Sequence, residues 1–536
     1  MQLRAKQASS LAVLSASFPA PALSGSLRRS LKRTFAIALL AALAVGTASA
    51  QNWVATNFLP PVSLVQPHNP LLLTDGTVIF HDGQGTVPSY WYKLTPDING
   101  SYLNGTLTTL TPLPGTYSPL YFSSQILKDG RVLIEGGEYN QNNSVWTDQG
   151  AIYDPLANTW TARTPPAGWT EIGDAASIML PDQTYLQTNC CNSGPKFALM
   201  APPYTDGSWV AYSGQGKADS YDEEGLTLLP NGKVLTVDAN RSNALTASEL
   251  FTQSTHTWSA GPSTIVSLTD LSSRGRGSHE VGPMLLLPNG TVYATGGAPA
   301  NTTGHTSVYS IATGLWTAGP DFPSVSGVKM AVDDAPMALE PNGNAIIYAG
   351  PPVFNNGSHV FEWNGSTLTQ IAEPPNSPNN PSYAGNMLVL PTGQIFFTDF
   401  SYDIEVYNPV GTYNPAWAPK VMFLTTTAAH PLSSNILARG STYVAYGTQF
   451  NGLSAGASYG DDSQADTNFP LVRFVNQATG HVFYGRTHDF STRAVATGNA
   501  IVFTQFDVPA GMETGAAYLY VVANGIPSPP VAMMIN

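Results

Sequence analysis

The chain has 536 residues, of which 43% are hydrophobic and 11% charged, with 49 glycines, 43 prolines and a formal net charge of −13. It is too long for one ordinary hydrophobic core, so two domains or one large closed array are expected. The composition excludes a disordered chain and a membrane-embedded one, and the acidic balance argues against nucleic acid and anionic membranes as partners.

Residues 1–50 are predicted to be an export signal. They hold six basic residues and no acidic residue, followed by an apolar run at 35–45 and the small residues Ala48-Ser49-Ala50. This pattern is typical of a cleaved signal peptide, and the apolar run is too short for a permanent anchor. Sec-type export is favoured over the twin-arginine route, which Arg28-Arg29 match only loosely. We therefore expect a secreted or periplasmic protein without an integral membrane span.

The mature chain, from residue 51, is dominated by a repeat. Seven segments each contain an apolar strand, a tight turn and a second apolar strand, and their turns lie 54, 53, 49, 58, 53 and 50 residues apart. The segments are 70–81, 125–137, 176–189, 226–238, 284–297, 337–350 and 387–400. Most turns are Asp-Gly or Asn-Gly, which tolerate positive φ angles, so each segment is predicted to be a β-hairpin. The spacing fits one four-stranded blade per unit.

Aromatic residues supply the outer half of each predicted blade. A Tyr or Phe is followed seven residues later by a Trp, as in Tyr153 to Trp160 and Phe251 to Trp258, and double glycines such as Gly136-Gly137 close inner hairpins. The last blade lacks a fourth strand, and residues 52–58 are predicted to provide it. Such a closure removes exposed sheet edges. We expect a seven-bladed β-propeller over residues 51–412.

The repeat stops after a linker at 413–419. Residues 420–536 contain short alternating strands with turn signals, which predict an immunoglobulin-like β-sandwich. The fold class is therefore all-β, with a propeller followed by a sandwich.

The combination of double glycines and spaced Tyr and Trp residues resembles kelch repeats, and the whole mature chain resembles the galactose oxidase and glyoxal oxidase family in domain order. The segments that carry the resemblance are Ala418-Pro419-Lys420-Val421, residues 484–489, residues 506–510 and residues 524–528. It implies a kelch propeller with an early-set C-terminal sandwich. It also implies that His488 lies on a hairpin that reaches the propeller channel, and that Tyr383 takes the place of the axial tyrosine of the copper site.

Other groups of the family's copper site are missing. The histidine expected beside Tyr383 is Ala384, the radical tyrosine position holds Asp174, and the cysteine position falls near Ser123. A tyrosyl-radical copper oxidase with a cross-linked Tyr-Cys cofactor is therefore not expected.

Each predicted blade carries a polar or ionisable residue shortly before its inner hairpin, where the chain would line one end of the central channel. These residues are His68, Tyr121, Asp174, Glu223, Glu280 (beside His279), Asp334 (beside Asp333) and Tyr383. Like charges in an enclosed cleft raise one another's pKa or are neutralised by a cation. The alternative is that the carboxylates cap strand starts and face water.

The metal hypothesis assigns His68, His279, His488, Glu223 and Asp334 as ligands. This mixed oxygen and nitrogen set suits calcium, manganese, iron or zinc, with copper in an unfamiliar site as a further option. Ligand contacts are assigned to Glu280, Asp333 and Tyr121. If the protein is an enzyme, Tyr383 and Asp174 are the candidate acid and base.

Two other features leave alternatives open. The only cysteines, Cys190 and Cys191, are adjacent, and they form either a vicinal disulfide or two free thiols. Gly460-Asp461-Asp462 with Asp466 could hold calcium in the sandwich, although the segment lacks the spacing of an EF-hand loop.

Two functions follow from these observations. The first is an extracellular protein that binds a glycan or protein partner at the propeller face without redox chemistry. The second is a metal-dependent oxidoreductase, hydrolase or lyase that acts on a carbohydrate-like substrate at the acidic channel mouth. Fold alone does not decide between them, because propellers host many functions.

Overall fold

The computed structural model describes residues 52–57, 65–191, 194–270, 279–432 and 434–536. The expected export signal falls outside these residues. From residue 50 onward the chain forms one compact unit. Among the described residues, strands make up nearly all of the regular structure, with three short 3-10 helices, η1 (Ser377–Asn379), η2 (Ser382–Ala384) and η3 (Pro415–Trp417). Within the described ranges, no helix has the length and hydropathy that crossing a membrane would need.

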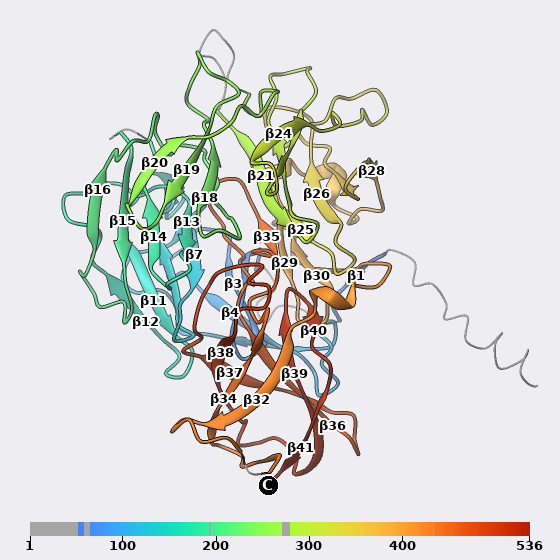
Figure 1. The fold of residues 1–536 in the computed structure, drawn as a ribbon. Helices are drawn as coiled ribbons and strands as arrows, with labels where there is room; N and C mark the ends of the chain where they lie inside the picture. The colour runs from blue at the N-terminus through green and yellow to red at the C-terminus, as the bar shows by residue number, and fades with distance from the viewer. Residues whose placement is uncertain (1–51, 58–64, 192–193, 271–278, 433) are drawn as a thin grey trace, which may run out of the picture. The chain divides into compact units, whose positions relative to one another are not determined.

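Seven antiparallel sheets follow one another along the chain and are numbered here as blades (Figure 1). Blade 1 contains β2 (Pro67–Leu72), β3 (Val78–Asp82), β4 (Trp91–Thr95) and β5 (Thr106–Thr109), and blade 2 contains β7 (Ser123–Ile126), β8 (Val132–Glu135), β11 (Gly150–Asp154) and β12 (Thr159–Arg163). Blade 3 contains β13 (Ser177–Met179), β14 (Tyr185–Thr188), β15 (Lys196–Met200) and β16 (Val210–Ser213), and blade 4 contains β17 (Thr227–Leu228), β18 (Val234–Val237), β19 (Ser248–Thr252) and β20 (Thr257–Ala260).

Blade 5 contains β21 (Val281–Leu287), β22 (Thr291–Gly296), β23 (Thr306–Ser310) and β24 (Leu315–Ala318). Blade 6 contains β25 (Met337–Leu339), β26 (Ala345–Ala349), β27 (His359–Trp363) and β28 (Leu368–Gln370). Blade 7 contains β29 (Asn386–Val389), β30 (Ile395–Thr398), β31 (Glu405–Asn408) and the N-terminal strand β1 (Asn52–Ala55). The predicted hairpins are the two innermost strands of each blade. The prediction of an all-β chain with a kelch-type propeller is thus confirmed.

The inner hairpins of all seven blades have the same type of turn. The second residue of each predicted turn pair has a left-handed backbone, with φ between 76° and 92° in Gly76, Gly130, Gln183, Gly232, Gly290, Gly343 and Gly393. The first residue of each pair does not. The turns are therefore type I turns followed by a left-handed residue rather than the two-residue turns that the dipeptides favour. Glycine suits that position because it has no Cβ to clash.

The blades close into a ring. Strand β29 of blade 7 contacts β2 of blade 1, as β7 contacts β13, β17 contacts β21, β21 contacts β25 and β25 contacts β29. The N-terminal strand β1 pairs with β31 of blade 7, and Trp53 lies opposite Tyr407. First and last parts of the propeller sequence thus share one sheet, which covers the edge that β31 would otherwise expose. The exact domain boundaries stay a prediction.

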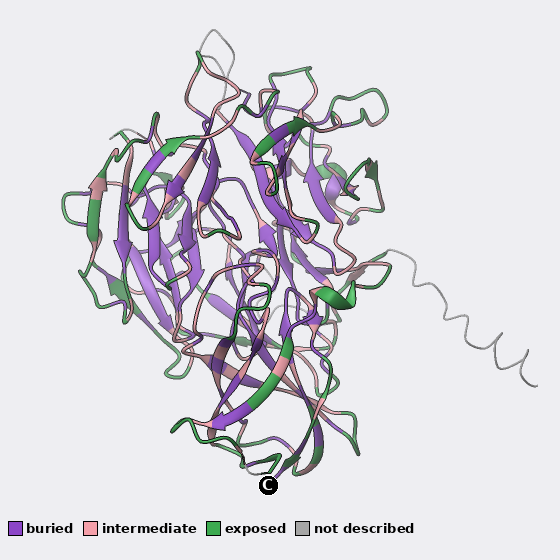
Figure 2. Cartoon of the chain, viewed as in Figure 1, coloured by how far each residue is buried: buried purple, intermediate pink, exposed green. Residues whose placement is uncertain are grey.

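Burial follows the order of the strands within each blade. Inner strands such as β3 and β18 are buried, whereas outer strands such as β16 and β24 are largely exposed, as the purple and green segments in Figure 2 show. Outer tryptophans pack inward from the exposed edge: Trp160 lies opposite Tyr153 and Trp258 opposite Phe251. The repeat therefore buries its apolar residues between neighbouring blades.

The C-terminal region forms a sandwich (orange to red in Figure 1). Its strand order is β32-β34-β38-β37-β36-β39-β41-β33, with β40 beside β39. The strands are β32 (Lys420–Thr426), β33 (Ile436–Leu437), β34 (Thr442–Thr448), β36 (Leu471–Asn476), β37 (Val482–His488), β38 (Val502–Asp507), β39 (Gly515–Ala523), β40 (Ile526–Pro527) and β41 (Val531–Ile535). Phe474, Phe506 and Leu519 pack in its core.

One segment leaves the sandwich and runs among the inner strands of the propeller. We call residues 453–468 the channel segment. Its strand β35 (Ala457–Ser458) pairs with β25 of blade 6. Further along, Gln464 accepts hydrogen bonds from Ser124 of blade 2 and Ser177 of blade 3. The channel segment thus joins the sandwich to blades on different sides of the ring.

Candidate functional site

A cavity of about 470 Å³ lies where the inner strands of several blades begin. Among the described residues, its lining contains seven carboxylates, four aromatic rings and no histidine, lysine or arginine. The lining residues are Leu120, Tyr121, Glu138, Tyr139, Asn142, Asp174, Glu223, Glu280, Asp334, Phe354, Tyr383, Asp461 and Asp462. A cavity with this charge is suited to a cation or to a ligand that carries one.

The blade residues reach the cavity because each lies just before an innermost strand. Glu280 directly precedes β21, and Asp334 lies shortly before β25. Three of these residues, Tyr121, Glu223 and Asp334, have left-handed backbones with φ of 51°, 61° and 42°. Such conformations cost residues with a Cβ on the order of 1 kcal/mol each, so the surroundings must hold them. Strained backbone of this kind concentrates at functional sites.

Asp461 and Asp462 come from the channel segment. Both are almost fully enclosed, at 1% and 2% exposure. Gly460 permits this approach, because a Cβ at residue 460 would overlap Oδ1 of Asp334. One oxygen each of Glu223, Asp334 and Asp461 lie within 4.8 Å of one another. Blades 4 and 6 and the sandwich therefore each contribute one carboxylate to a single cluster.

The carboxylates raise one another's pKa. Burial and then the charges of Asp461 and Asp334 hold the pKa of Glu223 well above its usual range. Burial and the Asp334 charge do the same for Asp461, and burial raises the pKa of Asp334 to about 7. Each ionised form is disfavoured because it lacks water and faces like charges.

Several oxygens in the cavity lack a hydrogen-bond donor among the described residues. They are Oε2 of Glu280, Oδ1 of Asp334, Oδ2 of Asp461 and both side-chain oxygens of Asp462. Buried acceptors without a partner are costly, and native proteins normally satisfy them. The cavity therefore offers a set of oxygen ligands that the described residues do not saturate.

The aromatic rings form one wall. Tyr121 is in edge contact with Tyr383 at 6.3 Å between ring centroids, and Tyr383 contacts Phe354 at 5.6 Å. Tyr139 lies 6.2 Å from Tyr121. It is placed there by a small sheet of β6 (Pro119–Leu120), β9 (Tyr139–Asn140) and β10 (Asn143–Ser144). The cavity thus combines acidic groups with flat apolar surfaces.

Six of the residues singled out from the sequence meet in this cavity: Tyr121, Asp174, Glu223, Glu280, Asp334 and Tyr383. Their roles stay predictions. The sequence analysis missed Glu138, Tyr139 and Phe354, and it placed Asp461 and Asp462 in the sandwich rather than here. The Gly460-Asp461-Asp462 motif was a visible signal, but its location depends on the path of the channel segment, which no local pattern reveals.

Two of the predicted histidine ligands lie elsewhere. His68 is fully buried, stacks on Phe400 at 4.2 Å and lies edge-on to Tyr121, outside the lining of the cavity. Burial lowers its pKa well below the usual value, so it is neutral. His279 faces Asp222, with Nδ1 3.9 Å from the carboxylate, and it does not line the cavity either. The position of His68 before its inner hairpin and that of His279 beside Glu280 therefore did not place their rings in the lining.

The family resemblance implies that His488 lies on a hairpin that reaches the propeller channel, and the structure places it differently. Next to it, the Thr487 N–H donates to the Thr74 carbonyl at 3.1 Å and the Asp489 N–H to the Lys128 carbonyl at 2.7 Å. Those carbonyls belong to the turns of the inner hairpins, at the strand ends away from the cavity. Strand β37 is paired with β36 and β38 and stays in the sandwich, so the channel segment approaches the cavity in its place.

Asp333 also differs from the expectation that it contacts a ligand. It is 1% exposed, and its oxygens accept hydrogen bonds from the backbone N–H groups of Ala298 at 3.1 Å and Val353 at 2.6 Å. Burial raises its pKa to about 7. Its carboxyl group therefore holds two loops beside the cavity rather than facing into it.

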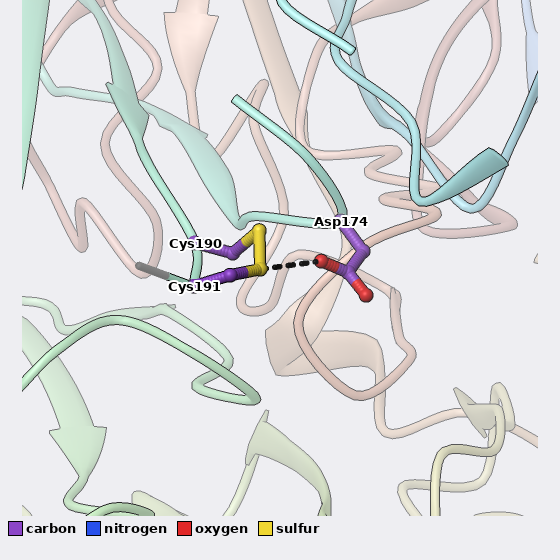
Figure 3. A group of neighbouring side chains, drawn as sticks. All are labelled: Asp174, Cys190 and Cys191. Atoms are coloured by element: carbon purple, nitrogen blue, oxygen red, sulfur yellow. Dashed lines mark hydrogen bonds between the residues drawn. A yellow bond between two sulfur atoms is a disulfide. The ribbon is translucent and has the colours of Figure 1, made fainter. Parts of the chain in front are cut away.

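The two cysteines form a vicinal disulfide at the edge of the site. Figure 3 shows Cys191 Sγ facing the carboxylate of Asp174, with the sulfur 3.5 Å from Oδ1. The open alternative from the sequence is thus decided in favour of the bonded pair. Since Asp174 also lines the cavity, the disulfide is part of the structure that supports the site.

The copper-radical group of the family that the sequence resembles needs two histidines and a tyrosine linked to a cysteine. The described residues of the cavity lining include no histidine, and both cysteines are bonded to each other. The donor set here is composed of carboxylate and phenol oxygens.

The fold defines the chain as a seven-bladed, kelch-type β-propeller followed by a β-sandwich. The Kelch-like protein terF of Aspergillus terreus (strain NIH 2624 / FGSC A1156) is 30% identical over 86 residues, which are 16% of this chain and 18% of that protein. The match thus spans less than a fifth of the length of the relative. No protein-family model matches the chain.

Two solved structures are similar in chain path. A fungal alcohol oxidase of the AA5 family, solved in complex with copper, covers 91% of this chain and all (100%) of its own, at 11% identity and a TM-score of 0.48. Hydrazine synthase of Kuenenia stuttgartiensis covers 54% of this chain and 77% of its own, at 15% identity and a TM-score of 0.34. Both scores lie below 0.5, so these similarities say nothing about activity.

Proposed function

We propose that this protein binds a divalent cation in its acidic cavity and, through that cation, a hydroxyl-rich ligand of the carbohydrate class. The observation that carries the proposal is the cluster of Glu223, Asp334 and Asp461, whose oxygens converge within 4.8 Å. The described residues of the lining include no cationic side chain. A bound cation would offset the repulsion that raises the pKa of these groups.

The ligand chemistry favours a hard cation. Carboxylate oxygens are the preferred ligands of calcium and manganese, and the part of the lining that the structure describes has no histidine or cysteine that would favour zinc or copper. Asp462 and Glu280 stand next to the cluster and offer further buried oxygens without a donor. The cluster can therefore supply the several oxygen ligands that such ions take.

The rest of the cavity suits a glycan better than a protein partner. A space of about 470 Å³ admits a small ligand or one sugar unit of a chain, not a protein surface. Tyr121, Tyr383 and Phe354 present rings on which the apolar face of a sugar can stack, and a cation can bind its hydroxyl groups. We propose that this binding takes place outside the cytoplasm, in line with the expected export signal, and without tyrosyl-radical copper chemistry.

A second candidate function uses the same cavity for catalysis. Its supporting observation is that Asp174 and Tyr383, the candidate acid and base, line the same cavity as the carboxylate cluster. Burial holds the pKa of Asp174 well above its usual range, so this carboxyl group can keep a proton and donate it during turnover. The protein would then be a metal-dependent enzyme that acts on a carbohydrate-like substrate.

The test is cation binding by the exported protein. After treatment with a chelator and dialysis, we expect calorimetric titration with Ca²⁺ or Mn²⁺ to show one site. Asp461→Asn should weaken its affinity at least tenfold. The control is Asp321→Asn, which changes an exposed carboxylate paired with His305 on the outside of blade 5. Equal affinities for the Asp461→Asn and control variants would contradict the cation site.

A glycan array with and without a chelator then tests the ligand class. Glycan binding that disappears with the chelator supports the proposal. Turnover of a bound glycan would favour the enzyme, whereas the absence of any glycan binding in the presence of the cation would overturn the carbohydrate assignment.

A further inference from the structure

The vicinal disulfide is held in a tightly packed corner next to the acidic cavity. Cys190 is fully buried, and its N–H donates to the Ile172 carbonyl at 2.9 Å. Gly173 lies directly against it, because a Cβ at residue 173 would overlap the Cys190 sulfur. Gly173 has a φ of 70°, a conformation that suits glycine. The sequence thus allows the chain to pass close to the sulfur pair.

The next residue, Asp174, faces both the sulfurs and the cavity. One oxygen of Asp174 and the sulfur atoms of Cys190 and Cys191 all lie within 4.8 Å of one another (Figure 3). Two sulfurs and one carboxylate at this distance are a complete set of three protein ligands for a metal ion that prefers sulfur. In the disulfide the sulfurs are bonded to each other and cannot act as thiolate ligands.

We propose that Cys190, Cys191 and Asp174 form a redox-gated binding site for a thiophilic divalent cation. A dithiol reductant transfers two electrons and two protons to the disulfide. The S–S bond breaks, Cys190 and Cys191 become thiols, and the reductant closes into its own disulfide. The cation then binds both sulfurs as thiolates, releases their two protons to solvent and takes the Asp174 carboxylate as its third protein ligand.

This site differs from the proposed calcium or manganese site in its ligand atoms and in its dependence on the redox state of the cysteines. The Glu223, Asp334 and Asp461 cluster contains only oxygen ligands and is open to a cation in either redox state. The cysteine site has soft donors and exists only after reduction. Asp174 lines the cavity and reaches both places, so a cation held by the thiolates would also withdraw this carboxylate from the cavity.

The experiment uses Cd²⁺ as the probe. The chain is reduced with dithiothreitol, desalted without oxygen and titrated with Cd²⁺, while cadmium–thiolate absorption in the ultraviolet reports on sulfur ligation. We expect reduced protein to bind one Cd²⁺ with this absorption and oxidised protein to show none. Reoxidation should release the ion.

Matched variants separate ligation from folding. Cys191→Ser should remove most of the absorption, and Asp174→Asn should keep it while weakening Cd²⁺ affinity about tenfold. Circular dichroism and tryptophan fluorescence must show that both variants are folded. If Cys191→Ser does not fold, Asp174→Asn still distinguishes a site with a carboxylate ligand from simple thiol binding.

Asp461→Asn makes this result independent of the proposed function. That variant removes a ligand from the all-oxygen cluster but leaves the cysteine pair intact, so its redox-dependent Cd²⁺ absorption should equal that of the wild type. The proposal is overturned if reduced wild-type protein shows no more cadmium–thiolate absorption than oxidised protein, or if Asp174→Asn binds Cd²⁺ as tightly as the wild type.

Discussion

The Tyr459 hydroxyl donates a hydrogen bond of 2.6 Å to the backbone carbonyl of Tyr383. Tyr459 belongs to the channel segment, and Tyr383 lies in helix η2 at the rim of the cavity. Tyr459 is only 3% exposed, so the bond is shielded from water. It ties the C-terminal region of the chain to the last blade at the site where the carboxylates meet.

Tyr459→Phe removes this hydrogen bond and little else. We expect it to lower the free energy of unfolding by about 1–2 kcal/mol, since the Tyr383 carbonyl would lose its buried donor. Urea denaturation measures the effect. Tyr402→Phe is the control, because Tyr402 is 52% exposed. Equal stability of Tyr459→Phe and the wild type would show that the channel segment is not held through this bond.

Gly460 tests whether the geometry of the acidic cluster matters apart from its charge. A Cβ at residue 460 would overlap Oδ1 of Asp334, the movable end of that side chain. Gly460→Ala should therefore displace the Asp334 carboxylate without changing net charge. We expect about a tenfold loss of Ca²⁺ or Mn²⁺ affinity with a change in stability of roughly 1–2 kcal/mol, a small overpacking cost. Calorimetry and urea denaturation measure the two quantities.

Gly511→Ala is the matched control, since a Cβ at residue 511 has nothing within 4 Å. Unchanged cation affinity in Gly460→Ala would mean that the cation does not bind at Asp334.

A second acidic cluster in the protein is neutralised by a lysine side chain of the chain itself. In blade 4, Lys217 is fully buried and its ammonium group contacts Asp219, Glu224 at 2.9 Å and Glu249 at 2.7 Å. These carboxylates hold the pKa of Lys217 well above its usual value. The cavity has a comparable group of carboxylates, and no lysine or arginine is among those lining residues that the structure describes. This contrast within one chain supports a cation supplied from outside.

Lys217→Met should be severely destabilising. It leaves three carboxylates buried without their counter-ion, and removing one partner of a buried ion pair costs about 3–5 kcal/mol. Lys420→Met makes the same replacement at an exposed position and should change stability by less than about 0.5 kcal/mol. Urea denaturation compares the two variants. A loss below about 1 kcal/mol for Lys217→Met would contradict the view that Lys217 neutralises this cluster.

The parts of the fold that depend on local sequence were predictable. The Asp-Gly and Asn-Gly pairs mark the inner hairpins because only a residue tolerant of positive φ suits that turn position. Even Gln183, the exception in blade 3, takes this conformation with a φ of 76°. Mouth residues such as Glu223 and Glu280 were likewise predictable, because each lies shortly before an inner strand and the repeat brings these points together.

Long-range relationships were not predictable from local patterns. Asp461 is more than a hundred residues from Asp334, and only the path of the channel segment through the propeller brings them together. For His488, a local pattern predicted a long-range position that the structure does not show. A motif similar to that of a known family marked it as a channel residue, but strand pairing in the sandwich keeps its side chain beside Asp489 and Asp507.

The acidic cavity should also make stability depend on pH. Burial raises the pKa of Asp334 from 3.8 to about 7 in the folded protein. Between these two values the folded state binds more protons than the unfolded state, so the free energy of unfolding must decrease as pH rises from about 4 to about 7. Above pH 7 this contribution is constant. One pKa unit corresponds to about 1.4 kcal/mol, so the total loss from this residue is on the order of a few kcal/mol.

Urea denaturation at pH 5 and pH 8 tests this relationship. We expect the wild type without divalent cation to lose more stability between these pH values than Asp334→Asn, whose amide does not ionise. Saturating Ca²⁺ or Mn²⁺ should reduce the pH dependence of the wild type, because a cation stabilises the ionised carboxylates and lowers their pKa. Other buried acids such as Glu135 and Glu405 titrate in both proteins and cancel in the comparison. The same pH dependence in wild type and Asp334→Asn would show that Asp334 is not the group whose ionisation the folded protein resists.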